Sequence, residues 1–302
     1  MKAYGFLYMM AAALLLSACT AKEEEAGEPV AASVQAGITT RATVDNTWTA
    51  GEDAIGVYVT SAGATKGSNI KYVASDQTGS FSPTDEPIYF ADGKDATFCA
   101  YYPYTEYSEM NADGTINWQG GSVKDGKCDW DFLFADGATA RKSSPVVNFT
   151  GDKAFKHCMA MVKFTIKAGY GIEYGEKLLN FIMDEVHNDG AVDPRDGTVM
   201  LFAGKTALTE PVNQTLDNDL TISFILLPQA VTDNSIDIIL ETSVEDAKNK
   251  YSTTLTAPAG GKFVGGSVYS YTIRVTNAGI KFENLSIETW QAVNQGNLNI
   301  DA

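Results

Sequence analysis

The sequence predicts an all-β protein, because most apolar segments alternate with polar residues and turn-forming runs separate them. Val162, Phe164 and Ile166, for example, alternate with polar side chains. A period of two puts one set of side chains on a core face and the other toward water. Runs rich in Gly, Pro, Asn and Asp at 111–114 and 193–197 have the composition of tight turns. Short strands with frequent turns are typical of β-sandwiches.

The same alternation locates the individual strands along the chain. We expect them, in chain order, at 55–59, 88–90, 97–102, 162–167, 220–227, 236–240, 251–256 and 269–276. Only 176–186 could be helical, and its apolar residues at 178, 179, 181, 182 and 183 would serve a buried strand equally well. The conformation of this segment stays open at the level of sequence.

The N-terminus has the features of a lipoprotein signal peptide. Lys2 precedes an apolar stretch, 4–16, that is too short for a permanent membrane span. The stretch ends in Leu-Ser-Ala-Cys at 16–19, the form of a lipobox, in which the Cys19 thiol accepts diacylglycerol. An ordinary signal peptide is the alternative, but the apolar run stops directly at Cys19. We therefore expect a lipoprotein of the outer membrane, anchored by Cys19.

These features divide the chain into four expected parts. They are a signal peptide at 1–18, a lipidated flexible tether at 19–36, an N-terminal β-sandwich at 37–150 and a C-terminal β-sandwich at 151–302. The acidic run at 20–25 is similar to an export tag for surface lipoproteins, and a solvated linker is the alternative.

Composition limits the classes of partner and cofactor. The formal net charge is −16, which disfavours nucleic acid and anionic lipid head groups, because both need Lys/Arg clusters. Beyond Cys19 the cysteines are Cys99, Cys128 and Cys158, without the C-x-x-C spacing of a zinc site. At most one disulfide can form among them, and the sequence leaves their pairing open. We expect no cofactor.

An enzyme is also disfavoured. A Ser-His-Asp hydrolase needs a histidine against a nucleophile, and only His157 and His187 are present, without a G-x-S-x-G elbow. We interpret His157 as a structural residue at a domain junction and His187 as part of a polar turn. Asp189, Asp193 and Asp196 could hold calcium, but their spacing fits a turn-rich connector better.

Aromatic residues in or near the expected loops of the first domain have two interpretations. They are Trp118, Trp130, Tyr101, Tyr104 and Tyr107. Exposed aromatic rings could stack on sugars, for which Trp118 and Trp130 are the candidates, whereas aromatic side chains more often pack in a core.

Several segments in a fixed order resemble the fimbrillin-like family. They are 40–42 (Thr-Arg-Ala), 48–58 (Trp-Thr-Ala-Gly-Glu-Asp-Ala-Ile-Gly-Val-Tyr), 97–104 (Thr-Phe-Cys-Ala-Tyr-Tyr-Pro-Tyr), 131–135 (Asp-Phe-Leu-Phe-Ala), 155–164 (Phe-Lys-His-Cys-Met-Ala-Met-Val-Lys-Phe), 227–229 (Leu-Pro-Gln), 266–271 (Gly-Ser-Val-Tyr-Ser-Tyr) and 287–290 (Ile-Glu-Thr-Trp). The resemblance implies two tandem transthyretin-like β-sandwich domains, no catalytic activity, and a pilus subunit or surface adhesin whose partners are other fimbrial subunits.

The resemblance also implies a route of assembly. In such pilins a protease cuts after an arginine that follows the first strand, and the C-terminal segment of a neighbour fills the vacated groove by β-augmentation. Arg41 matches the cleavage position, with 36–40 as the expected first strand. A solvent-facing arginine at a strand end is the alternative.

The candidate donor strand is 280–290 with the tail 291–302. Its apolar candidates are Ile280, Phe282, Ile287, Trp290, Leu298 and Ile300. Few tail residues are large and apolar, which suits a tip or anchor subunit, or a member that does not polymerise. The alternative function is a monomeric surface lipoprotein that binds a glycan or a host protein.

Overall fold

The computed structural model describes residues 28–38, 48–64, 67–90, 92–124, 129–232, 235–245 and 247–290. Several predicted features lie outside these residues, namely the signal peptide 1–18, the acidic run 20–25, Cys19, Arg41, Cys128, Leu298 and Ile300. The described residues form strands joined by turns and two short 3₁₀ helices, η1 (Tyr107–Glu109) and η2 (Gly151–Lys153). The all-β prediction is confirmed. Among the described residues, no helix has the length and apolar character needed to cross a bilayer.

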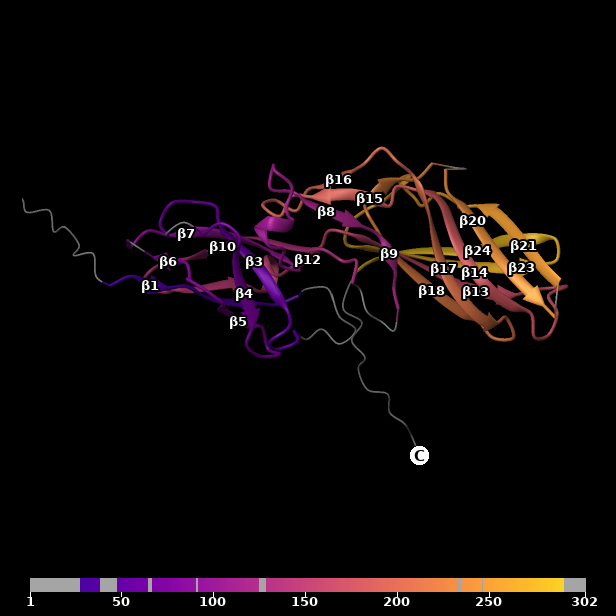
Figure 1. Ribbon diagram of the computed structural model, residues 1–302, viewed down its shortest axis with the longest axis horizontal. Coiled ribbons are helices and arrows are strands. Elements are labelled where there is room, and N and C mark those ends of the chain that lie inside the picture. Colours follow the sequence, from indigo (N-terminus) through magenta and orange to yellow (C-terminus); the bar gives the residue numbers. More distant parts are fainter. Residues whose placement is uncertain are drawn as a thin grey trace, which may run out of the picture.

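The first lobe is built on an eight-stranded sheet (Figure 1). In spatial order its strands are β11 (Val146–Phe149), β2 (Ser33–Ala36), β5 (Ser80–Pro83), β4 (Ile70–Ala74), β3 (Ala54–Val59), β7 (Ala96–Tyr102), β10 (Leu133–Ala140) and β12 (Lys156–His157). A short turn joins β10 to β11, although they lie in distant parts of this order. The sheet therefore curls back around one apolar core, and the short pair β1 (Val30–Ala31) and β6 (Tyr89–Phe90) lies beside it.

The expected tether at 19–36 is wrong at its C-terminal end. Residues 30–36 form β1 and β2, and Ala32, Val34 and Ala36 are buried in the first core. The expected first strand at 36–40 is likewise displaced toward the N-terminus. Small side chains explain both differences, since an Ala-rich stretch has the composition of a linker but also fits a crowded interior.

The second lobe is a sandwich of two sheets that enclose a second core. One sheet has the order β24 (Gly279–Thr289), β23 (Ser267–Thr276), β13 (Ala160–Ala168), β18 (Leu220–Leu226) and β9 (Gly121–Ser122), and the other β17 (Thr206–Thr215), β14 (Lys177–Val186), β20 (Asp237–Val244) and β21 (Ala247–Thr254). β19 (Gln229–Ala230) and β22 (Lys262–Phe263) form a separate two-stranded pair. Ring contacts cross the interior: Phe181 of one sheet lies 4.8 Å from Phe164 and 5.7 Å from Phe224 of the other.

The segment 176–186, open at the level of sequence, is strand β14. Irregularities in its pairing lie between Leu178 and Asn180 and between Met183 and Val186. A bulge shifts the alternation by one residue. The apolar residues therefore do not follow a strict period of two, although Leu178, Phe181, Met183 and Val186 are all buried.

A segment of the first half crosses into the second half. β8 (Ile116–Gln119) joins β15 (Asp189–Val192) and β16 (Val199–Leu201) in a three-stranded sheet, and β9 pairs with β18 (Figure 1). The expected N-terminal domain, 37–150, had included these residues in the first lobe. Their pairing depends on partners about 70 to 100 residues away, for which a single sequence carries no signal.

Candidate functional site

The N-terminal stretch 30–36, called the first strand below, comprises β1 and β2, and β2 occupies an internal slot of the eight-stranded sheet. β2 pairs in parallel with β11 and antiparallel with β5. The Ala36 amide donates to the Gly79 carbonyl at 2.8 Å, and the Ser33 amide donates to the Pro145 carbonyl at 3.1 Å. Gly79 has φ +100°, and a Cβ there would lie 2.1 Å from the Ala36 oxygen, so only glycine permits this approach. The slot is therefore lined closely on both sides.

Both ends of the segment that contains Arg41 are anchored beside this slot. Before it, Ile38 bridges to Phe155. After it, the buried Trp48 donates from Nε1 to the Ala36 carbonyl at 2.9 Å, and its ring meets Phe81 at 5.0 Å. Arg41 lies between these two points in the sequence and outside the described residues.

The predicted donor residues on 280–290 belong to the chain's own sheet. β24 is the edge strand of the five-stranded sheet and pairs with β23 along its whole length. Ile280 and Phe282 are half-buried against the second core, whereas Ile287 is 43% exposed. A donor role for these residues would therefore require β24 to leave the second lobe. The tail after Trp290 lies outside the described residues.

Trp290 fixes the end of β24 at the junction between the lobes. Its indole is buried and stacks on the His157 ring at 3.8 Å, with 6° between the planes. Its amide donates to the Gly266 carbonyl at 2.7 Å. Trp290 is thus a structural anchor within the chain.

His157 is hydrogen-bonded to a buried carboxyl group, Asp131, that the sequence analysis did not identify. His157 Nδ1 hydrogen-bonds to Asp131 Oδ2, and both side chains are fully buried. Burial raises the pKa of Asp131, and the neighbouring His157 opposes that shift in part. Asp131 Oδ1 and His157 Nε2 have no hydrogen-bond partner among the described residues.

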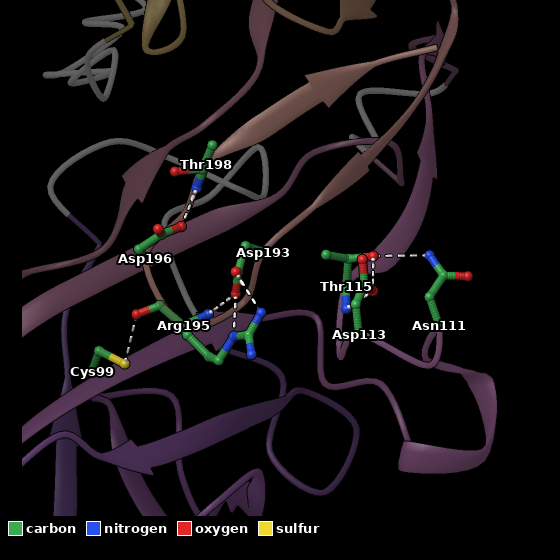
Figure 2. Close-up of polar contacts among 8 residues, drawn as sticks. All are labelled: Cys99, Asn111, Asp113, Thr115, Asp193, Arg195, Asp196 and Thr198. Carbon is green, nitrogen blue, oxygen red and sulfur yellow. Dashed lines mark hydrogen bonds and ion pairs between the residues drawn. The ribbon is translucent and has the colours of Figure 1, made fainter.

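The loop that contains Asp193 and Asp196, two of the three residues considered for calcium, is a connector held by hydrogen bonds (Figure 2). Arg195 donates to both Asp193 carboxylate oxygens at 2.7 and 2.6 Å, and the Cys99 thiol donates to the Arg195 carbonyl at 3.4 Å. The Thr198 amide donates to Asp196 at 2.8 Å. Arg195 lowers the pKa of Asp193. In the part of the chain that the structure describes, no group of three or more potential ligands is placed to hold a metal.

The two described cysteines are free thiols. Cys99 is buried and Cys158 partly buried. Burial raises the pKa of each thiol to about 12, which makes both poor nucleophiles near neutral pH.

The structure brings Trp118 and Trp130 together at one open cavity of about 690 Å³. Its other lining side chains include Asn117, Gln119, Asp189 and Phe202. Sequence reasoning missed Asp189 and Phe202 here, because they follow the tryptophans by more than 50 residues and reach the cavity only through β15 and β16.

The remaining candidates from the sequence have other environments. Tyr101 is buried and stacks on Phe132 at 5.6 Å. Tyr104 lies under the Lys71 ammonium, and Tyr107 donates to Ser68 at 2.7 Å. His187 Nδ1 lies 3.2 Å from the Phe202 carbonyl and 3.1 Å from that of Gly204, so it supports one wall of the cavity.

The comparisons with known proteins agree with one another. Residues 40–290 match the family model described as fimbrillin-like. The chain is 30% identical over 98% of both sequences to a protein of Bacteroides uniformis named as a candidate fimbrium subunit, Fim1C. A solved structure of a candidate cell adhesion protein from the same species has a TM-score of 0.65 and 26% identity, over 87% of this chain and 99% of that one. Another from Bacteroides ovatus, 22% identical, shows the same fold with a TM-score of 0.69, over 87% and 98%. The chain therefore belongs to the fimbrillin-like family of fimbrial and cell adhesion proteins.

Proposed function

We propose that the chain is a structural subunit of surface fimbriae whose precursor is anchored by lipid on Cys19. The precursor is cleaved after Arg41, which removes the anchor, and the subunit assembles by exchange of its first strand. The observation that carries the proposal is the position of β2. It lies inside a sheet, between β5 and β11, and is followed in sequence by Arg41.

Loss of the first strand would leave a receptor groove. The inner edges of β5 and β11 would present unpaired amides and carbonyls, and the space of Ala32, Val34 and Ala36 would open to the first core. Such an edge accepts an extended segment with alternating apolar side chains. Leu298 and Ile300 alternate in the tail after Trp290, and we assign them the donor role in a neighbouring subunit. The two transthyretin-like domains implied by the resemblance belong to this proposal.

Arg41→Ala is expected to abolish maturation. Wild-type protein recovered from the outer surface should begin at Ala42 and form oligomers that resist detergent until heated. The variant should retain the acylated Cys19 as its first residue and stay monomeric, because the protease has lost its cleavage site. N-terminal sequencing with intact mass measures both.

Arg141→Ala is the matched control for Arg41→Ala. Arg141 is a half-exposed arginine in the β10–β11 turn, and its replacement should leave processing unchanged. A wild-type chain that begins at acylated Cys19 and is monomeric would contradict the strand-exchange proposal and favour a standing surface binder of a glycan or a host protein.

Cys19→Ala is expected to remove the lipid anchor. Metabolic labelling with a radioactive fatty acid is carried out in the Arg41→Ala background, where the N-terminal segment is retained. It should mark Arg41→Ala and Arg41→Ala/Cys158→Ala, but not Arg41→Ala/Cys19→Ala, because only Cys19 stands in the lipobox. The anchored fraction should fall together with the label. Equal labelling of all three chains would exclude Cys19 as the acceptor.

A further inference from the structure

The cavity beside β8 and β15 presents aromatic side chains to solvent. Trp130 is 39% exposed and Phe202 47% exposed, and Trp118 lines the same space. Soluble proteins bury most of their large aromatic side chains. Three that converge on one cavity are a feature of binding sites, where aromatic groups supply most of the contact area.

The two indoles are held in place by the backbone. Trp118 Nε1 donates to the Trp130 carbonyl at 2.8 Å. The Trp130 ring lies on Gly121, where a Cβ would come within 2.2 Å of Nε1. Gly190, opposite Trp118 in the ladder, could not carry a Cβ either, since it would lie 2.3 Å from the Met200 carbonyl oxygen. The rings are therefore preorganised rather than loose surface groups.

Planar polar side chains surround the rings. Asn117, Gln119, Asp129 and Asp189 line the cavity, and Gln119 Nε2 donates to Asp189 Oδ1 at 2.6 Å. Amide and carboxylate groups each offer two hydrogen-bonding atoms in one plane. No Lys or Arg is among the described lining residues. The described lining is thus rich in acceptors, and its two charged side chains are both carboxylates.

The geometry points to a binding site for a neutral oligosaccharide. A pyranose ring has faces of C–H groups, which stack on indole, and a rim of hydroxyls, which donate to carboxylates and exchange hydrogen bonds with amides. Sialylated, uronic or sulfated sugars would place an anion beside Asp129 and Asp189 without a cation to neutralise it. The volume of about 690 Å³ lies within the usual range of small-molecule sites. This inference goes beyond assembly and holds for a monomer and a polymer alike.

The test is a binding titration on the full chain, purified from cells in detergent. The probes are neutral oligosaccharides ending in glucose, galactose, mannose, N-acetylglucosamine or fucose, their sialylated and sulfated counterparts, and lysine-rich peptides. At least one neutral probe should bind saturably and quench tryptophan fluorescence. Trp130→Ala should raise the dissociation constant of that probe at least about tenfold, and Asp189→Ala should raise it about fivefold.

Two further variants separate a binding role from a structural one. Gly121→Ala keeps every lining side chain but displaces the Trp130 indole, so it should weaken binding as Trp130→Ala does. Tyr174→Ala removes a 93% exposed aromatic at the far turn between β13 and β14 and should leave binding unchanged. Circular dichroism must show that all variants are folded.

Four results would overturn the inference. They are the absence of saturable binding by any neutral probe at millimolar concentration, an unchanged dissociation constant in Trp130→Ala, tighter binding of the sialylated or sulfated probes, and displacement of the sugar by the lysine-rich peptides. The last result would identify a cationic peptide as the occupant.

Discussion

Asp131→Ala should destabilise the protein by about 3 kcal/mol, because it leaves a buried ring nitrogen of His157 without its hydrogen-bond partner and opens a cavity. The variant leaves His157 Nδ1 without its hydrogen-bond partner, in a site where neither side chain reaches solvent. The stacked Trp290 would lose its support, so the end of β24 should loosen as well. Urea unfolding followed by tryptophan fluorescence measures the free energy of unfolding.

Two variants calibrate this value. Asp131→Asn keeps an acceptor for His157 and should cost less than Asp131→Ala. Asp152→Ala removes an exposed carboxylate from η2 and should change stability by no more than about 0.5 kcal/mol. If Asp131→Ala were no more destabilising than Asp152→Ala, the buried pair would have no structural role.

The raised pKa of Asp131 gives the same pair a pH signature. Burial makes the folded state hold the Asp131 proton at a pH where the unfolded state has released it. The contribution of Asp131 to the free energy of unfolding therefore falls as the pH rises from 3.8, the ordinary pKa of aspartate, toward the raised pKa of Asp131 in the folded protein. Asp131→Asn lacks this titration, so it should gain stability relative to wild type over that range. A constant difference from pH 3 to 7 would contradict the assignment.

Val34→Asp is the second substitution with a large expected effect. Val34 is 1% exposed in the first core, and a carboxylate there would have no partner. We expect the free energy needed to release the first strand from the sheet to fall by at least about 3 kcal/mol. If β2 is a removable strand, the chain should respond by releasing residues 28–38 while both cores stay folded.

Hydrogen exchange distinguishes local release from global unfolding in Val34→Asp. The amides of Ala32 and Ala36, which donate to Ile88 and Gly79, should exchange rapidly, while those of β13 and β23 remain protected. Gln35→Asp, on the other face of the strand, is the control and should keep the Ala36 amide protected. Equal loss of protection in β13 would mean that the first strand is integral to the fold.

The sequence predicted the fold class well because alternation is a local signal. The sequence did not predict the structure of three segments in which contacts between distant residues override the local pattern. β14 contains bulges that hide its period, β2 is made of residues that also suit a linker, and β8 finds its partners only in the folded chain. Bulges, small-residue packing and remote pairing are decided by tertiary contacts, which a single sequence does not display.

The residues of the candidate sites were likewise predicted only in part. The fimbrillin-like resemblance is confirmed by the family match over 40–290. Trp118 and Trp130 were named from their residue type alone, and the structure adds Asp189 and Phe202 from a distant part of the chain. His157 was placed at the junction, but its partner Asp131 is 26 residues earlier, a spacing with no periodic meaning.

The crossing of β8 and β9 into the second half has a mechanical consequence. A subunit in a filament carries tension from one end to the other, and here the lobes share two ladders, a third apolar cluster and the Lys124–Glu210 ion pair. Pulling the lobes apart must break these contacts together, so the junction should bear load as a rigid coupling rather than bend as a hinge. The cavity on β8 and β15 lies on this coupling, and drag on a bound ligand would pass directly into both lobes.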